Sequence, residues 1–146
     1  MNSIDTAVVN QRGQQQEQGL LIGLNFREHD PVWNPADSLA ELEQLALTAG
    51  ICVAGSMLLP IRRLNPATLI GTGQARKIAR LVAEMHCSTV IFDDNLLPRQ
   101  QRNLEKLLEA KVVDRTTLIL DIFAIHARTA EGKLQVERAQ IDYILP

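Results

Sequence analysis

The sequence contains few aromatic residues, few cysteines and no long apolar run, and each shortage excludes a class of protein. Aromatic residues make up 3% of the 146 residues, so the core has to be built from aliphatic side chains. The two cysteines, Cys52 and Cys87, do not have the spacing of a metal site. We interpret both as small core hydrophobes of a protein that lives in a reducing compartment.

The chain also lacks the segments that direct proteins to membranes. Met1–Gln18 is polar and has no apolar stretch of the kind found in a signal peptide. No apolar run approaches the roughly 20 residues that are needed to span a bilayer. We therefore predict a cytoplasmic protein without a membrane span.

Net charge predicts no partner by itself, because it is only -2, but the charges are unevenly distributed. Among the first 48 residues, seven acids accompany only Arg12 and Arg27. Residues 61–83, in contrast, hold five bases and no acid. A basic segment on a nearly neutral protein can contact phosphate. The alternative interpretation is an ordinary solvated face.

The alternation of predicted elements favours an α/β domain. Strands are predicted at residues 20–26, 51–61, 68–71, 89–92 and 111–113, and helices at 37–49 and 74–85 and from Pro98 onward. Asp37 or Ser38 is the expected cap of the first helix. Such alternation is typical of a mostly parallel sheet flanked by helices, which we place at residues 20–128. Residues 1–19 are rich in glutamine and are predicted to be a disordered polar tail.

The end of the chain contains two different helical patterns. Leu118–Ile125 is apolar nearly all the way round, which predicts a helix buried in a core. Asp121 within it would then need a cationic partner, either Arg115 or Arg128. After a break, residues 129–146 have an apolar stripe of helical period. We interpret them as the first helix of an incomplete helical subdomain.

A glycine turn is the first candidate binding site. Gly71, Thr72 and Gly73 stand where a predicted strand passes into a predicted helix, a position at which backbone N–H groups can approach phosphate. Arg76 and Lys77 follow in the first turn of that helix. The third glycine of the dinucleotide fingerprint is absent, so a tight turn alone explains the pattern equally well.

A pair of carboxylates is the second candidate. Asp93 and Asp94 end a predicted buried strand, and in an open α/β sheet this end faces the ligand crevice. They could hold a metal ion or accept a hydrogen bond from a ribose. We favour a structural role, in which they cap the next helix or pair with Arg99 or Arg102. No residues stand out as catalytic or as metal ligands.

Three sequence blocks resemble HflX-type GTPases, a family of ribosome-associated proteins. The first is the run DRT-x-LILDIFA with ART-x-EGKLQVE-x-AQ, which begins at Asp114. The others are PATLIGTG at Pro66–Gly73 and VIFDDNLLPRQQRNLE at Val90–Glu105. The blocks follow the order of the family from Pro66 to Pro146. The chain therefore resembles the N-terminal domain of this family together with the start of its helical linker.

The resemblance implies partners and cofactors as well. Intact family members bind the large ribosomal subunit and split stalled particles with GTP as the switch. Ribosomal RNA, the missing GTPase domain and the returning linker helix are thus the expected partners. GTP and Mg²⁺ would belong to that missing domain. The residues expected to contact RNA are Arg62, Arg63, Arg80, Arg128 and Lys133.

The motifs of a GTPase are missing from this chain. The phosphate-binding loop needs the pattern G-x-x-x-x-G-K-[ST], but Gly132-Lys133 is followed by Leu134, and Ala127 occupies the position of the first glycine. No Asn-Lys-x-Asp occurs. We predict no GTP hydrolysis by that mechanism. The alternatives are a stand-alone ATP-binding or weak ATPase module at the glycine turn, because the family is credited with an ATP-related activity, or a nonfunctional fragment.

Some positions depart from the pattern of the family. The family commonly has lysine where this chain has Gln74, serine at Leu97 and leucine at Arg138. The lysine difference weakens the case for charge-based phosphate binding at the glycine turn. The other two indicate relaxed constraint and fit a truncated gene product or paralogue.

Overall fold

A computed structural model describes residues 17–26 and 32–128. Its elements, in chain order, are β1 (Gln18–Phe26), α1 (Pro35–Thr48), β2 (Cys52–Ile61), α2 (Thr72–Glu84), β3 (Thr89–Phe92), α3 (Pro98–Leu108), β4 (Lys111–Asp114) and a helix over residues 115–128. The strands form one sheet in the order β2-β1-β3-β4, and every neighbouring pair is parallel. The predicted α/β class is confirmed.

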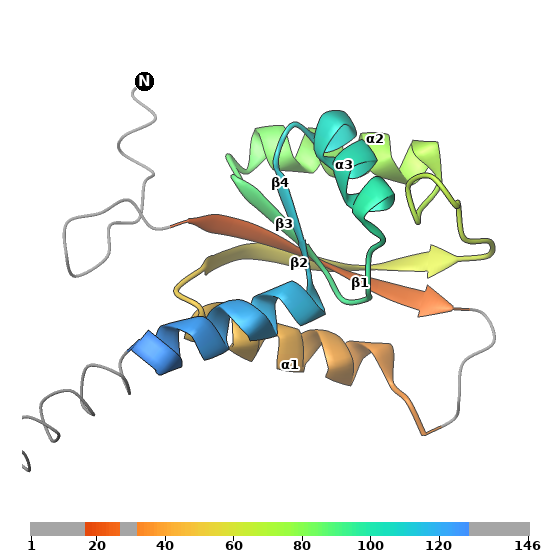
Figure 1. Cartoon of the computed structure of the whole chain (residues 1–146). Helices are drawn as coiled ribbons and strands as arrows, with labels where there is room; N and C mark the ends of the chain where they lie inside the picture. The colour runs from red at the N-terminus through yellow and green to blue at the C-terminus, as the bar shows by residue number, and fades with distance from the viewer. Residues whose placement is uncertain (1–16, 27–31, 129–146) are drawn as a thin grey trace, which may run out of the picture.

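Helices cover both faces of this sheet (Figure 1). The layer of α2 and α3 lies on one face, and the layer of α1 and the helix of residues 115–128 lies on the other. Strands buried on both faces are continuously apolar, and β3 accordingly has four fully buried residues. Ile22 and Phe92 belong to the core cluster under α2 and α3, whereas Leu21 and Ile91 belong to the cluster under α1.

The strand order creates a switch point beside β1. The connection through α1 leads from β1 to β2 on one side, and the next connection returns past β1 to β3 on the other side. Because the chain after β1 leads to α1 on one face of the sheet and the chain after the neighbouring β3 leads to α3 on the other face, a crevice opens at the carboxyl ends of β1 and β3. Open α/β sheets bind ligands in such a crevice.

Several sequence predictions for single elements are confirmed, but the first helix begins earlier than predicted. The strand at residues 89–92 and the helix that starts at Pro98 are confirmed. Neither Asp37 nor Ser38 caps α1. Asn34 does, since its Oδ1 accepts a hydrogen bond from the N–H of Ala36 at 2.9 Å. Pro35, with its fixed φ, begins the helix instead.

The strand predicted at residues 68–71 is absent. Asn65 and Leu69 instead form an isolated antiparallel bridge, with N–H to C=O distances of 3.0 and 2.7 Å. Leu69 has a φ of 65°, and the Thr68 hydroxyl donates to the Ile70 carbonyl at 2.7 Å. The apolar side chains of Leu69 and Ile70 are buried, as in a core strand. The short-range hydrogen bonds, however, fold this segment into a loop.

The prediction of a helix buried in the core at residues 118–125 is wrong. Leu118 is 1% exposed, whereas Leu120 is 61% and Phe123 66% exposed. A helix in an outer layer can contact the sheet with one side only, so its other apolar side chains stay at the surface. Asp121 is exposed as well and needs no partner. Similarly, Leu107 of α3 is 46% exposed, whereas Leu104 and Leu108 of the same helix are buried.

The predictions for the two ends of the chain, the polar tail and the linker helix, lie partly or wholly outside the described residues. Gln18 and Gly19, which we assigned to the polar tail, are the first residues of β1. The rest of that tail and the predicted linker helix of residues 129–146, including Lys133, lie outside the described residues. Within the described ranges, no helix is both long and apolar enough to cross a membrane.

Candidate functional site

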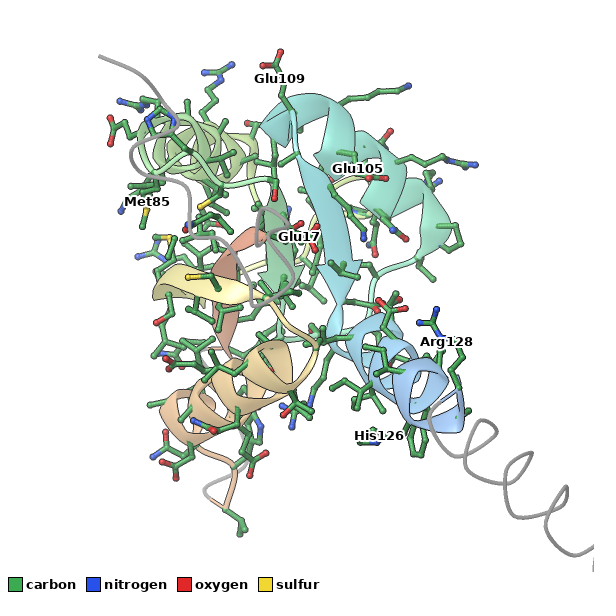
Figure 2. All side chains as sticks on the ribbon, turned by 90° about the vertical axis from the view of Figure 1, so that its left-hand side faces the viewer. Glu17, Met85, Glu105, Glu109, His126 and Arg128 are labelled. Atoms are coloured by element: carbon green, nitrogen blue, oxygen red, sulfur yellow. The ribbon has the colours of Figure 1, made fainter. Side chains whose placement is uncertain are left out.

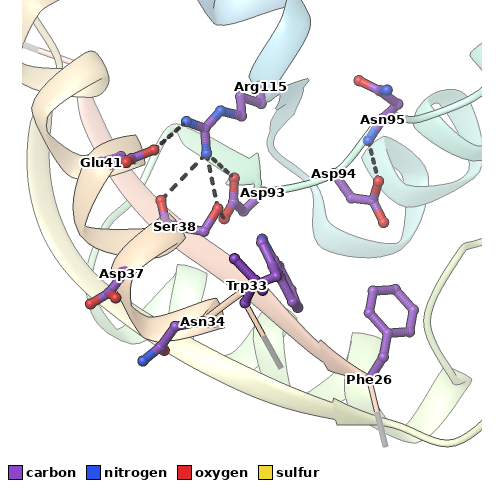
Figure 3. Close-up of a pocket in the computed structure, with 11 residues that line it drawn as sticks. Phe26, Trp33, Asn34, Asp37, Ser38, Glu41, Asp93, Asp94, Asn95 and Arg115 are labelled. Atoms are coloured by element: carbon purple, nitrogen blue, oxygen red, sulfur yellow. Dashed lines mark hydrogen bonds and ion pairs between the residues drawn. The ribbon is translucent and has the colours of Figure 1, made fainter. Parts of the chain in front are cut away.

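A pocket occupies the switch point at the carboxyl edge of the sheet (Figure 3). Its volume is about 800 Å³. It is formed where β1 and β3 end and where α1 and the helix of residues 115–128 begin. The lining residues are Phe26, Val32, Trp33, Asn34, Asp37, Ser38, Glu41, Asp93, Asp94, Asn95 and Arg115.

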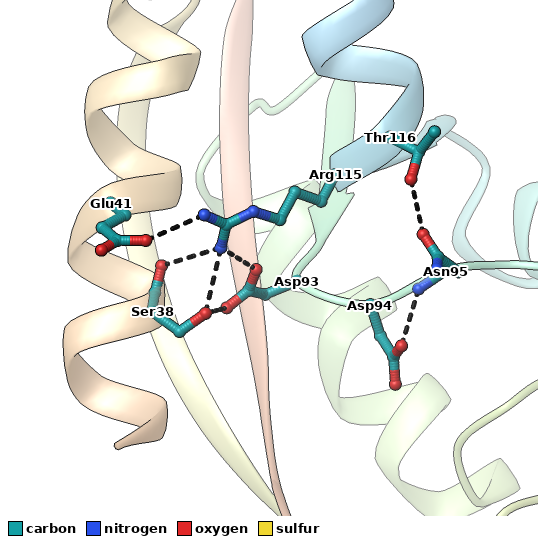
Figure 4. Close-up of polar contacts among 7 residues, drawn as sticks. All are labelled: Ser38, Glu41, Asp93, Asp94, Asn95, Arg115 and Thr116. Carbon is teal, nitrogen blue, oxygen red and sulfur yellow. Dashed lines mark hydrogen bonds and ion pairs between the residues drawn. The ribbon is translucent and has the colours of Figure 1, made fainter. Parts of the chain in front are cut away.

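Arg115 is the centre of a polar network on one wall of this pocket (Figure 4). Its Nη1 donates to Asp93 Oδ1 at 2.9 Å and to Ser38 Oγ at 3.0 Å, and its Nη2 donates to Glu41 Oε2 at 2.9 Å. The Ser38 hydroxyl donates to the second oxygen of Asp93 at 2.6 Å. The Asp93 side chain is 3% exposed, so these partners offset the cost of burying its charge.

The same partners hold the Arg115 guanidinium in its charged form. Burial alone would lower the pKa of Arg115, but the hydrogen bonds and negative charges of Asp93 and Glu41 raise it. The structural role that we favoured for Asp93 is therefore observed, with a different partner. Arg99 donates instead to the Pro66 carbonyl at 3.1 Å. Arg115 replaces it because it follows β4, the strand next to β3.

Asp94 has a different environment from that of Asp93. Its Oδ1 accepts a hydrogen bond from the N–H of Asn95 at 2.7 Å. Burial raises the pKa of Asp94, and the charges of Asp93 and Asp114 raise it further, against the lowering effect of the Asn95 N–H. In Figure 3 its carboxylate points toward the side of the pocket that holds Phe26, away from Arg115. Asp94 is thus the carboxylate of this pair that Arg115 does not contact.

A second network fixes the loop that follows β3. Asp114 accepts hydrogen bonds from the N–H groups of Leu96 at 3.0 Å and Thr117 at 2.8 Å. Burial alone would raise the pKa of Asp114, but these N–H groups outweigh burial and lower it. Thr116 donates to Asn95 Oδ1 at 2.6 Å (Figure 4). The beginning of the last described helix and the pocket loop are therefore held together.

The glycine turn lies apart from this pocket. None of residues 71–77 lines it, and Gly71 instead caps α2. The N–H of Gly71 donates to Gln74 Oε1 at 3.2 Å, and Gln74 Nε2 donates to the Pro60 carbonyl at 2.8 Å. Gln74 thereby ties the turn to the end of β2. The structure thus separates the candidate nucleotide residues into the glycine turn with Arg76 and Lys77, and the carboxylates in the pocket.

Exposed bases gather around that turn. We call Arg62, Arg63, Arg76, Lys77 and Arg80 the basic surface, and all five are exposed. Both ion pairs found among the described residues involve Arg115, so the basic surface has no acidic partner in that part of the chain.

Arg99 and Arg102 extend this charge onto the neighbouring α3 and were not foreseen as RNA contacts. Their positions in the first turns of an exposed helix were the available signal. Arg128, which was foreseen, lies in the opposite helical layer (Figure 2) and does not join the basic surface.

Comparison with known proteins identifies the family. The model of the family described as GTP-binding GTPase N-terminal matches residues 36–124. The chain is 47% identical over 108 residues to GTPase HflX of Flavobacterium psychrophilum and 42% identical over 132 residues to GTPase HflX of Escherichia coli. The chain belongs to the family of HflX-type GTPase N-terminal domains. The resemblance in the sequence blocks is confirmed.

The HflX-type match covers much of this chain but little of each relative. It spans 74% of the chain and 26% of the Flavobacterium protein, and 88% of the chain and 29% of the Escherichia coli protein. The fold also matches a GTP-binding protein from Sulfolobus solfataricus, solved in complex with GDP, with a TM-score of 0.57 and 27% identity. That match covers 89% of the chain and 37% of the archaeal protein.

Proposed function

We propose that this chain is the ribosome-contacting N-terminal domain of an HflX-type GTPase and that its basic surface contacts RNA of the large subunit. The observation that carries the proposal is the set of five exposed bases without an acidic partner among the described residues. Family membership supports it, because the resemblance implies a ribosomal partner. We assign GTP hydrolysis to the part of the HflX-type relatives that lies outside the match, because residues 1–146 contain no phosphate-binding loop.

The physical basis of the contact is phosphate neutralisation. Each lysine or arginine that meets a phosphate releases a condensed counterion, so binding weakens linearly on a log–log plot against salt. Arg62 and Arg63 follow the end of β2, and Gln74 holds the first turn of α2 against that end. Two sets of bases therefore share one edge of the domain and can follow a single RNA backbone.

Co-sedimentation with purified large ribosomal subunits across a salt series tests the proposal. The double variant Arg62→Ala/Arg63→Ala should bind less tightly, and its salt slope should become shallower by about 0.7–0.9 for each lost phosphate contact. The matched control is Lys111→Ala/Arg128→Ala, which removes the same charge from exposed positions outside the basic surface and outside α3. Equal behaviour of the two double variants would show that the basic surface is a solvated face.

A GTP hydrolysis assay tests independently whether residues 1–146 contribute to RNA contact but not to GTP hydrolysis. The chain lacks the phosphate-binding loop, so purified protein should release no phosphate from GTP above buffer. The measurement is phosphate release at saturating GTP and Mg²⁺. Turnover at the rate of an intact GTPase would contradict the assignment.

A second candidate function is nucleotide binding at the glycine turn. A Cβ added at Gly73 would meet nothing within 4 Å, and at Gly71 it would meet only Gln74 Oε1, at 3.7 Å. Neither residue has a positive φ. The fold therefore has no steric or conformational need for glycine at these two positions, and close approach of a ligand such as ATP is a reason for both.

Gly73→Val tests this second function with little risk to the fold, because the new side chain starts in open space. The variant should lose ATP binding in a calorimetric titration and keep the salt slope of large-subunit binding. Ala83→Val, at an exposed position near the other end of α2, is the matched control and should bind ATP as the unmodified chain does. ATP binding that is indifferent to Gly73→Val would remove the nucleotide role.

A further inference from the structure

The pocket at the switch point has chemistry that RNA contact at the basic surface does not use. The guanidinium of Arg115 is already engaged by Glu41, Asp93 and Ser38 at 2.9–3.0 Å. It is therefore not available to bind an incoming anion. The rest of the pocket presents Asp94 and the half-buried rings of Phe26 and Trp33, which lie on the side away from Arg115 (Figure 3).

The charge of the described lining selects against phosphate. Four carboxylates, those of Asp37, Glu41, Asp93 and Asp94, accompany only one guanidinium. A nucleotide or other phosphate ester would be repelled here, since like charges at a few ångströms cost free energy in a partly desolvated site. A cationic ligand would be attracted.

The size and the walls of the pocket favour an organic cation over a metal ion. A volume of about 800 Å³ is that of a small-molecule site, far larger than one ion requires. Among residues 17–26 and 32–128, no three His, Cys, Asp or Glu side chains are grouped so that they could hold a metal ion. The faces of aromatic rings, in contrast, attract ammonium and guanidinium groups and also pack against aliphatic carbon.

We propose that this pocket binds an organic cation with a primary ammonium or guanidinium group. Asp94 receives the charged group, and the rings of Trp33 and Phe26 pack against the aliphatic body that carries it. The polar network of Arg115 serves as a rigid wall, because every one of its polar contacts is made within the domain. This site lies on the helical layer opposite to the basic surface and goes beyond the proposed RNA contact.

Trp33 is the single tryptophan of the chain, so its fluorescence reports occupancy of the pocket directly. Two probes distinguish the two sources of such a cation. Spermidine represents a free polyamine, and N-acetyl-arginine methylamide represents the side chain of a polypeptide. Inorganic phosphate is the anionic comparison. Either cation should change the fluorescence saturably, and the tighter of the two identifies the source.

Asp94→Asn is the decisive variant, because it removes one charge and keeps the shape of the side chain. It should weaken cation binding about tenfold, as expected for loss of a partly desolvated charge contact. Asp121→Asn is the matched control, since it removes the same charge from an exposed position that does not line this pocket. It should leave the affinity unchanged.

Isothermal titration calorimetry of the same proteins detects binding even if a ligand leaves the fluorescence of Trp33 unchanged. The proposal is overturned if neither cation releases or absorbs heat saturably, if phosphate binds more tightly than both cations, or if the two aspartate variants lose affinity equally. Equal loss would mean attraction by overall charge. Circular dichroism of Asp94→Asn confirms that a loss of binding is not a loss of fold.

Discussion

The two helical layers of this domain cover the same sheet and yet present opposite surfaces. In one layer, α2 carries Arg76, Lys77 and Arg80 and a single acid, Glu84, at its far end. In the other, α1 carries acids and no base, and four carboxylates and a single guanidinium line the pocket at its beginning. The sheet therefore keeps two charge environments apart, so that one small domain can meet two chemically different partners.

The layers differ in how their charges are balanced as well as in sign. At the pocket of the acidic layer, Arg115 is paired within the domain, whereas the arginines of the basic surface have no acidic partner among the described residues. A charge paired within the domain contributes to folding, and an unpaired charge at the surface is available to a partner. The predictions that follow test this distinction, from the largest expected effect to the smallest.

Apolar contacts should produce the largest contrast. Leu118→Ala should lower the free energy of unfolding by about 2–5 kcal/mol, because Leu118 is 1% exposed and truncation leaves a cavity in the core. Leu120→Ala, at a position on the same helix that is 61% exposed, should cost less than about 0.5 kcal/mol. Urea denaturation measures both. Equal losses would mean that both sides of the helix are packed.

Removing a paired arginine should cost more than removing an unpaired one. Arg115→Ala leaves the carboxylate of Asp93, which is 3% exposed, without its cation, and should destabilise the domain by about 3 kcal/mol. Arg76→Ala removes an exposed charge with no acidic partner in the described part of the chain and should change stability by less than about 0.5 kcal/mol. Thermal unfolding compares the two, and similar losses would contradict the distinction between the layers.

Helix caps should respond in opposite directions in the two layers. Asn34→Ala removes the side-chain cap of α1 and should cost about 1 kcal/mol. Leu97, at the corresponding position of α3, has an exposed apolar side chain that cannot accept a hydrogen bond. Leu97→Ser should therefore stabilise the domain by about 0.5–1 kcal/mol. Urea midpoints that moved the same way in both variants would refute this difference.

Below neutral pH, Asp114 and Asp94 should each make a small contribution to how the free energy of unfolding changes with pH. The two contributions should have opposite signs. The pKa of Asp114 is lowered, so its stabilising effect is present above its unfolded pKa of about 3.9 and is lost as pH falls through the folded value. The pKa of Asp94 is raised, so stability falls as pH rises from about 3.9 through the folded value.

Unfolding between pH 2.5 and 7 should separate these two contributions. Asp114→Asn should reduce the loss of stability on acidification, and Asp94→Asn should steepen it. Shifts of the same sign in both variants would contradict the assigned environments.

Most of the secondary-structure elements and the family could be predicted from the amino-acid sequence. Residues 89–92 form a strand because the β-branched Thr89 and three apolar residues in a row suit a strand buried on both faces, and Pro98 begins a helix because its fixed φ suits the first turn. These signals are local, so they can be read without knowing what lies across the fold. The ordered blocks from Pro66 onward likewise identified the HflX-type family from sequence alone.

Which charged side chains form ion pairs and which apolar side chains are buried could not be predicted, because both depend on long-range packing. Arg115 pairs with Asp93 because β4 lies beside β3 in the sheet, and nothing in the local sequence separates it from Arg99 as a partner. Likewise, Leu118 and Leu120 belong to one apolar run, but only Leu118 is turned toward the sheet. Strand order and the packing side of a helix are long-range properties. The pocket, which collects residues from four separate segments, follows from them.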